Sequence, residues 1–547
     1  MLMLLLCSCS TVEQDADDAG VSDSGRDGAV DEDSETGNKA TLDELYDPDT
    51  IQTFELKIDD ADLEAMHNAL PERIYVPAVF SWNEIEIQNV GVRYKGNSSS
   101  SPMASHKRSF LIKFNEYVKG RRLSGLRRLA IDNGIQFGSL FSERIITDVL
   151  RDMGVTTMRS NYCRLFINNE YKGVYVNVER IDNSFLDHHF ESDDGPLFKC
   201  DEGGPGADMT FHGDDLTVYE STFEEKNSED DKVDTDLAQL VRFLRDLNAV
   251  SDDHAVEFLE KNFELDEFIP LMAVMLYAGA FDQLTGWNAH NYYMYKKPSD
   301  DRWVYIAWDL DVGFSDNAFG EIPVLDGWNA AYAYPVAVRP VLKLVVENEE
   351  LLKRYRQHAE EILHRYFDPD VLVPELNRLY EQIRPDLEND PFPHVRVTNP
   401  GDTDYDSIIA SITDFIIRRH ERAVAELKDP KKTPPAEPDN EIPPPGEPSP
   451  DAPGDLRVTG KSASHISLAW KDNAADEAAF IVQRCTGAGC TDFQNHMGFP
   501  QPDLEEAVDN TVSAGTVYVY RVYAIKPAPG GPEATGPSNT VEAEAID

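Results

Sequence analysis

Apolar and polar residues alternate in short segments of the first half of the chain, which predicts β-strands. These segments are 54–58, 90–94, 109–114, 163–167 and 173–179. Apolar residues recur at helical spacing mainly in later segments, 139–153, 233–248, 266–281, 340–366 and 404–427. Since strands come mainly before helices, the order predicts an α+β domain with a sheet-rich amino-terminal part.

Changes in composition divide the chain into units. Residues 10–45 are acidic, rich in Gly and Ser and poor in aromatics. They cannot bury enough apolar area to fold, so we expect a disordered tether. Residues 46–428 contain the aromatic-rich strands and helices of the large domain, and the Pro-rich residues 429–453 predict a semi-rigid linker.

Residues 454–547 alternate again and predict a separate all-β unit with a buried Trp470. This unit resembles a fibronectin type III domain, an immunoglobulin-like sandwich. Cys485 and Cys490 flank a short turn there and are suited to a local disulfide in an oxidising compartment.

The first nine residues, MLMLLLCSC, form an apolar run that is too short to span a bilayer. They resemble the end of a bacterial lipoprotein signal, in which cleavage before Cys9 leaves that thiol for lipidation. We therefore expect an extracytoplasmic protein of the cell envelope that is anchored to a membrane through Cys9.

The formal charge of −50 argues against binding to nucleic acid, whose phosphates need a basic surface. It also argues against docking on anionic lipid. We expect a protein rather than a nucleic acid as the partner, and the sequence leaves the oligomeric state open.

Polar residues follow two apolar segments late in the large domain. Asp309 and Asp311 come directly after the strand-like run 303–308, and Asp282 ends an apolar helix with Asn291 in the loop after it. Carboxylate and amide oxygens suit Mg²⁺, which completes its shell with phosphate and water. The order Asp, Asn, Asp is the one that protein kinases use to orient a hydroxyl and to hold the metal.

A cation for phosphate is expected from the strand 109–114. Alternation places Lys113 on the face opposite the aromatic residues, where its ammonium is able to pair with phosphate. A carboxylate should hold this lysine, and Glu143 in the segment 139–153 is the first candidate. Glu179, at the end of another strand, is the alternative.

The chain lacks GxxxxGK[ST], GxGxxG after a strand, HExxH and GxSxG. In place of a glycine-rich loop it has a polar turn that contains Asn97 and Ser98. Backbone N–H groups and hydroxyls in such a turn are suited to cradle anionic oxygens.

Several motifs in order resemble the spore coat protein H (CotH) kinase family: YKGNSSS, KRSFLIKF, RLFINNEYKGVYVNVERID, HNYYMY and WDLDVGF. The resemblance spans roughly residues 50–425. It implies an atypical protein-kinase-like fold and secreted Ser/Thr phosphorylation with ATP and a divalent metal. By this resemblance Asp282 matches the catalytic Asp and Asp309 the metal-binding Asp. Asn291 matches the Asn of HNYY, Lys113 is our match for the phosphate-pairing lysine, and Asn288 stays an alternative metal ligand.

These observations together predict an atypical protein kinase of the cell envelope. It would use ATP with Mg²⁺ or Mn²⁺ to phosphorylate a Ser or Thr hydroxyl of a protein. The alternative is a surface binding or adhesion protein with an inactive kinase-like domain, which the tether and the fibronectin-like unit favour. A third interpretation is another metal-dependent transferase acting on protein.

Overall fold

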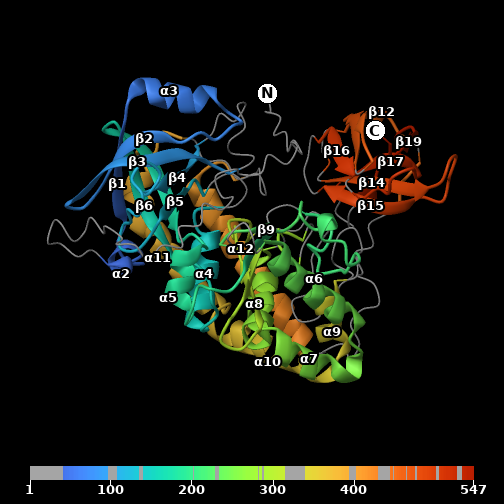
Figure 1. Ribbon diagram of the computed structural model, residues 1–547, viewed down its shortest axis with the longest axis horizontal. Coiled ribbons are helices and arrows are strands. Elements are labelled where there is room, and N and C mark those ends of the chain that lie inside the picture. Colours follow the sequence, from blue (N-terminus) through green and yellow to red (C-terminus); the bar gives the residue numbers. More distant parts are fainter. Residues whose placement is uncertain are drawn as a thin grey trace.

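The computed structural model describes most of the chain from Thr41 onward (Figure 1). The described residues are 41–96, 107–134, 139–200, 203–227, 233–280, 282–285, 289–314, 339–392, 402–428, 444–447, 449–463, 465–474, 477, 479–499, 504–509, 511–526 and 533–546. They form a mixed α+β domain followed by two β-sheets, which confirms the α+β expectation.

The amino-terminal part is a closed barrel in the order β1-β2-β3-β4-β5-β7-β6, in which β1 and β6 pair in parallel. Its strands are β1 (Gln52–Ile58), β2 (Val76–Trp82), β3 (Ile85–Lys95), β4 (Ser109–Lys113), β5 (Arg128–Asp132), β6 (Ser160–Ile167) and β7 (Glu170–Val178). Apolar side chains from alternate positions fill the interior, among them Phe110, Ile112 and Phe114. The alternation that we read in 109–114 is therefore confirmed. Helix α3 (Asp60–Asn68) packs against β2.

Residues 41–45, which we assigned to the tether, belong to the folded domain. Thr41 caps helix α2 (Leu42–Leu45), and its side chain and that of Glu44 each accept a backbone N–H of the other residue. Leu45 and Tyr46 are buried in the core of the barrel. Local capping and two apolar side chains thus order a segment whose composition resembles that of the tether.

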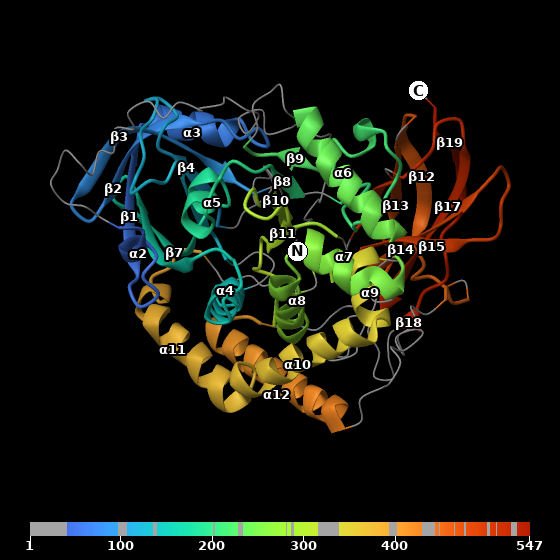
Figure 2. The same cartoon turned by 60° about the horizontal axis from the view of Figure 1, so that its bottom comes forward.

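Helices and a second sheet form the rest of the large domain. The helices are α4 (Ser142–Asp152), α5 (Asn183–His189), α6 (Val233–Ala249), α7 (Ala255–Asn262), α8 (Leu265–Ala278), α9 (Pro340–Glu347), α10 (Glu349–Arg365), α11 (Pro369–Leu387) and α12 (Tyr405–Lys428). The sheet has the order β11-β10-β8-β9, from β8 (Leu197–Cys200), β9 (Glu224–Glu225), β10 (Tyr292–Lys296) and β11 (Trp303–Ala307). Figure 2 shows α8 beside α10, with α11 and α12 along the same side of the molecule.

The predicted helices are present, with one difference. The segment 340–366 forms two helices, because Asn348 adopts an extended backbone and its side chain accepts the N–H groups of Glu350 and Leu351. Helix α11 was not predicted. It contains Pro374 and Pro385, and proline inside a segment argues against a helix.

The C-terminal unit consists of two antiparallel sheets that enclose one apolar core. One sheet has the order β12-β13-β16 and the other is built around β14 and β17. The strands are β12 (Gly454–Lys461), β13 (Ile466–Lys471), β14 (Ala479–Thr486), β15 (Gln494–Phe499), β16 (Glu506–Asp509), β17 (Val517–Lys526), β18 (Glu533–Ala534) and β19 (Val541–Glu544). Trp470 is buried between the sheets, as predicted.

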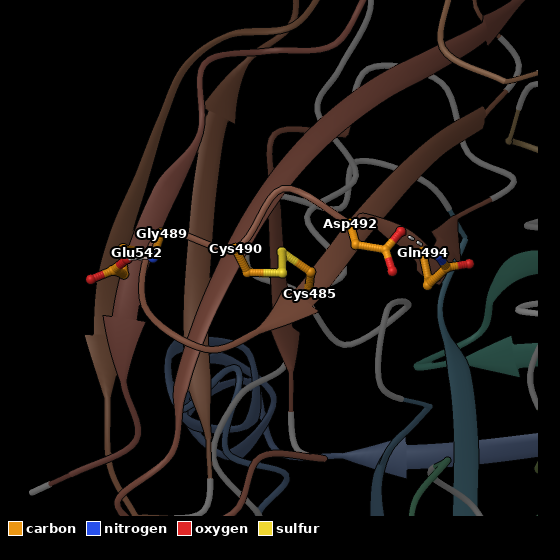
Figure 3. The surroundings of a disulfide bond; sticks show 6 residues. All are labelled: Cys485, Gly489, Cys490, Asp492, Gln494 and Glu542. Carbon is orange, nitrogen blue, oxygen red and sulfur yellow. Dashed lines mark hydrogen bonds between the residues drawn. A yellow bond between two sulfur atoms is a disulfide. The ribbon is translucent and has the colours of Figure 1, made fainter.

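Two local features stabilise this unit. Cys485 and Cys490 form a disulfide across the turn that follows β14, with the Cα atoms 5.9 Å apart (Figure 3). Buried Asp509 connects the two sheets, since its carboxylate accepts hydrogen bonds from Arg484 and Tyr520, each at 2.8 Å. In Figures 1 and 2 this unit and the barrel lie at opposite ends of the molecule.

Candidate active site

The two Asp-containing segments that the sequence singled out lie together. Asp282 follows α8, which ends at Gly279 in the left-handed conformation. Asn291 directly precedes β10, and its side-chain amide donates to the backbone oxygen of Asp282 at 3.1 Å and to its Oδ2 at 3.2 Å. His290 Nε2 lies 3.5 Å from Asp282 Oδ1.

The hairpin of β10 and β11 brings Asp309 to the same place. Tyr292 pairs with Ala307, so the residues just before β10 face the residues just after β11. The N–H of Trp308 donates to the backbone oxygen of Asn291 at 2.9 Å. Asn291 and Asp309 both have φ 58°, a left-handed conformation that is uncommon for residues other than glycine.

Acidic groups gather around this segment. Burial, followed by the charge of Asp309, raises the pKa of Asp311 well above its usual value, and Asp132, Glu143 and Asp282 add to the effect. Burial and then the charges of Asp132 and Asp309 raise the pKa of Glu143 to about 8. These groups come from β5, from α4 and from the segments after α8 and β11, which are far apart in the sequence.

The cation that the structure brings to these acids is Lys95, the last residue of β3. Its Nζ lies 2.5 Å from Asp132 Oδ2 and 5.5 Å from the centre of the Trp308 ring. Burial alone would lower the pKa of Lys95, but Asp132 and then Asp309 raise it above its usual value. Glu143 adds to this effect, so Lys95 is an ammonium surrounded by carboxylates.

Lys113 lies elsewhere. Its register partner across β3 is Gly91, whereas Lys95 pairs with Ser109, four residues along the same strand. Four residues of a strand span about 13 Å. The Lys113 ammonium pairs with Glu116 at 2.7 Å and lies over the ring of Tyr75. The structure therefore does not bring Lys113 to Asp282 or Asp309.

The two candidate glutamates are also separated. Glu143, early in α4, lies among the acids near Lys95, where it accepts the backbone N–H of Leu310. Glu179 is fully buried and pairs with Arg159 and His189. The structure thus gives Lys95 the neighbour Glu143 and gives Glu179 other partners.

Some sequence-based candidates lie outside the described residues. These are Asn97 and Ser98 of the polar turn, Asn288, and the expected anchor Cys9. The expectations for them stay predictions. The described residues that flank this segment are Lys95 and Gly96 before it and Lys107 after it, and Lys107 is fully buried.

The donor set fits a divalent cation bound together with phosphate. The Asn291 amide uses its nitrogen for both bonds to Asp282, so its oxygen is the atom that a cation would bind. A carboxylate, an amide oxygen and phosphate oxygens are ligands that Mg²⁺ accepts. Within the described ranges, no three His, Cys, Asp or Glu side chains converge closely enough to hold a metal ion by themselves.

Comparisons with known proteins show what the chain as a whole is similar to. A family model described as CotH kinase protein matches residues 92–422. Inner spore coat protein H of Bacillus subtilis is 20% identical over 343 residues, which are 62% of this chain and 89% of the relative. Invasin CotH3 of Rhizopus delemar is 23% identical over 373 residues, which are 65% of this chain and 59% of the relative. A solved structure titled "Myokine structure" covers 18% of this chain with 16% identity and a TM-score of 0.16, which is too low to carry an argument.

Proposed function

The chain belongs to the CotH kinase protein family, and from this premise we propose that it transfers the γ-phosphoryl group of ATP to a Ser or Thr hydroxyl of a protein. The observation that carries the proposal is the meeting of Asp282, Asn291, Asp309 and Lys95 in one place. Phosphoryl transfer requires little more of a protein than positioning and charge stabilisation, and these four side chains supply both.

Each residue has a role that its surroundings support. Asp282 orients the acceptor hydroxyl and takes its proton, because its carboxylate is partly exposed and is fixed by the Asn291 amide. Asp309 and the oxygen of Asn291 hold Mg²⁺ or Mn²⁺, which supplies charge neutralisation at the phosphates. Lys95, rather than Lys113, pairs with phosphate, because its ammonium already lies beside Asp309.

We place this activity outside the cytoplasm. The Cys485–Cys490 disulfide is a bond that persists in oxidising compartments. The relatives are a spore coat protein and an invasin by name. No helix in the described part of the chain is long and apolar enough to cross a bilayer. The lipid anchor at Cys9 and the fibronectin type III identity of the C-terminal sheets belong to the same proposal.

A second candidate function is binding at a surface without catalysis. The name Invasin CotH3 favours it, since this relative, 23% identical, is named as an invasin rather than as an enzyme. The two candidates differ in one requirement, because only a kinase needs Asp282, Asn291 and Asp309 in their present arrangement.

The test is transfer of labelled γ-phosphate by the full chain, with Mg²⁺ or Mn²⁺, to itself or to a generic protein acceptor. Asp282→Ala and Asp309→Ala are expected to abolish labelling. Asp214→Ala is the matched control, since this side chain is 78% exposed and pairs with Arg245 of α6. Absence of labelling by the wild-type chain, together with absence of metal-dependent ATP binding in calorimetry, would favour the surface-binding function.

A further inference from the structure

Gln283, the residue after Asp282, is buried with 1% of its surface exposed. Its side-chain amide donates to the backbone oxygen of Trp308 at 2.7 Å. Trp308 directly precedes Asp309. This hydrogen bond therefore connects Gln283, which follows Asp282, to Trp308, which precedes Asp309.

This bond closes a set of connections between the two segments. Trp308 donates its N–H to Asn291, and Asn291 donates its amide to Asp282. Both backbone polar groups of Trp308 are thereby bound to the segment that carries Asp282. Among these described residues, Gln283 takes part through its side chain, and we assign that side chain no contact with substrate or metal.

The segment needs such support because of its backbone. Asn291 and Asp309 are both left-handed at φ 58°. Residues in this conformation persist only where the surrounding contacts hold them, and they are common at sites whose geometry matters for function. Because the hydrogen bond from Gln283 fixes the carbonyl of Trp308, it also fixes the peptide plane between Trp308 and Asp309.

A buried glutamine at this position lowers the stability of the fold. In the described structure its Oε1 atom is buried without a hydrogen-bond partner. A buried acceptor without a partner lowers stability, and an apolar side chain of similar size would avoid that loss. The amide is therefore better explained by what its nitrogen does for Trp308 than by packing.

We propose that Gln283 is a positioning residue that sets the separation between Asp282 and Asp309. The acceptor hydroxyl and the metal-bound phosphate are then held in line for transfer. This inference rests on the proposed kinase function. Gln283 acts through its neighbours, so its loss should affect the alignment of the reactants more than the binding of either one.

The test replaces Gln283 by methionine, which has a similar length and no donor. Misplacement by about 1 Å can cost on the order of 100-fold in rate. We expect kcat of Gln283→Met to fall roughly 10- to 100-fold, while KM for ATP and the metal concentration for half-maximal activity change less than about threefold. Calorimetric stoichiometry of ATP binding gives the fraction of active protein, so misfolded material does not count as lost kcat.

Gln52→Met is the matched control. Gln52 is also buried and donates to a backbone oxygen at 2.7 Å, but that oxygen belongs to Glu44 in α2. Its replacement should lower the melting temperature and leave kcat per active site unchanged. If Gln283→Met is too unstable to purify, Gln283→Asn keeps the amide but shortens the side chain by one methylene and should also lower kcat.

The outcomes separate this inference from the function on which it rests. A wild-type chain that transfers no phosphate would overturn both. Transfer by the wild type with an unchanged kcat in Gln283→Met would overturn the positioning role alone. A loss of kcat equal to that of Gln52→Met, or a parallel loss of ATP affinity, would show that Gln283 serves stability or binding instead.

Discussion

The buried pair of Glu179 and Arg159 allows a quantitative test of the barrel. Glu179 follows β7 and is fully buried, and the Arg159 side chain is 4% exposed. Arg159 donates its Nε and its backbone N–H to the carboxylate, at 2.9 Å and 3.1 Å, and a second guanidinium nitrogen also binds it. His189 lies 3.3 Å away on α5. Glu179→Gln keeps the shape of the side chain and removes its charge.

The expected loss follows from the pKa of Glu179. Burial alone would raise it, but the hydrogen bonds from His189 and Arg159 lower it from 4.5 to about 2. At about 1.4 kcal/mol for each pKa unit, this difference corresponds to about 3 kcal/mol. Because the folded pKa lies below the unfolded one, this stability is complete above about pH 4.5 and is lost as the pH falls toward 2. The variant also leaves Arg159 with only the exposed Asp43, 3.8 Å away, as a carboxylate partner, which acts in the same direction.

The assay is scanning calorimetry of the full chain between pH 7 and pH 3. A loss of about 3 kcal/mol corresponds to a decrease of roughly 4 °C in the melting temperature of a unit as large as residues 46–428. The control is Glu170→Gln, because Glu170 is 71% exposed in its pair with Lys172 and should contribute little. A decrease below 1 °C at pH 7, or a difference that does not shrink as the pH falls below 4, would show that Glu179 is not a paired carboxylate.

Three further predictions test other parts of the structure. Lys95→Met should weaken Mg²⁺-dependent ATP binding at least about tenfold in calorimetry, whereas Lys113→Met should change it less than about twofold, because only Lys95 lies beside the site carboxylates. Asp509→Asn should destabilise the C-terminal sheets by about 3 kcal/mol and leave the melting of the large domain unchanged, since the buried carboxylate bonds three polar side chains of the other sheet. Asp390→Ala should cost about 3 to 5 kcal/mol in urea unfolding, because it leaves the fully buried ammonium of Lys107 without its carboxylate.

Much of the candidate site was predictable from local pattern. Asp282 and Asp309 stand where strongly apolar segments end, and the apolar face of the helix 139–153 predicted α4 and hence the position of Glu143. Each of these signals lies within about fifteen residues of sequence. The structure brings all three residues to one place.

The lysine was not predictable in the same way. Lys95 and Lys113 both lie at the end of an alternating strand, and the alternation itself does not distinguish them. The register of β3 against β4 decides between them, because it pairs Lys95 with Ser109 and Lys113 with Gly91. Asp132 was not predicted for a related reason, since β5 has only five residues and no distinct pattern of apolar and polar residues. The available signal was the position of Lys95 directly before the polar turn that we had already chosen for phosphate.

Several departures from ordinary structural rules occur at this site. Two non-glycine residues, Asn291 and Asp309, are left-handed there, and Gln283 buries an acceptor without a partner among the described residues. Burial, and then the nearby carboxylates, raise the pKa values of Glu143 and Asp311. Each feature lowers the stability of the fold, and apolar side chains in a relaxed backbone would avoid that loss. Their occurrence together is explained if these closely spaced carboxyl groups lose their protons when a cation arrives with phosphate, as the proposed phosphoryl transfer requires.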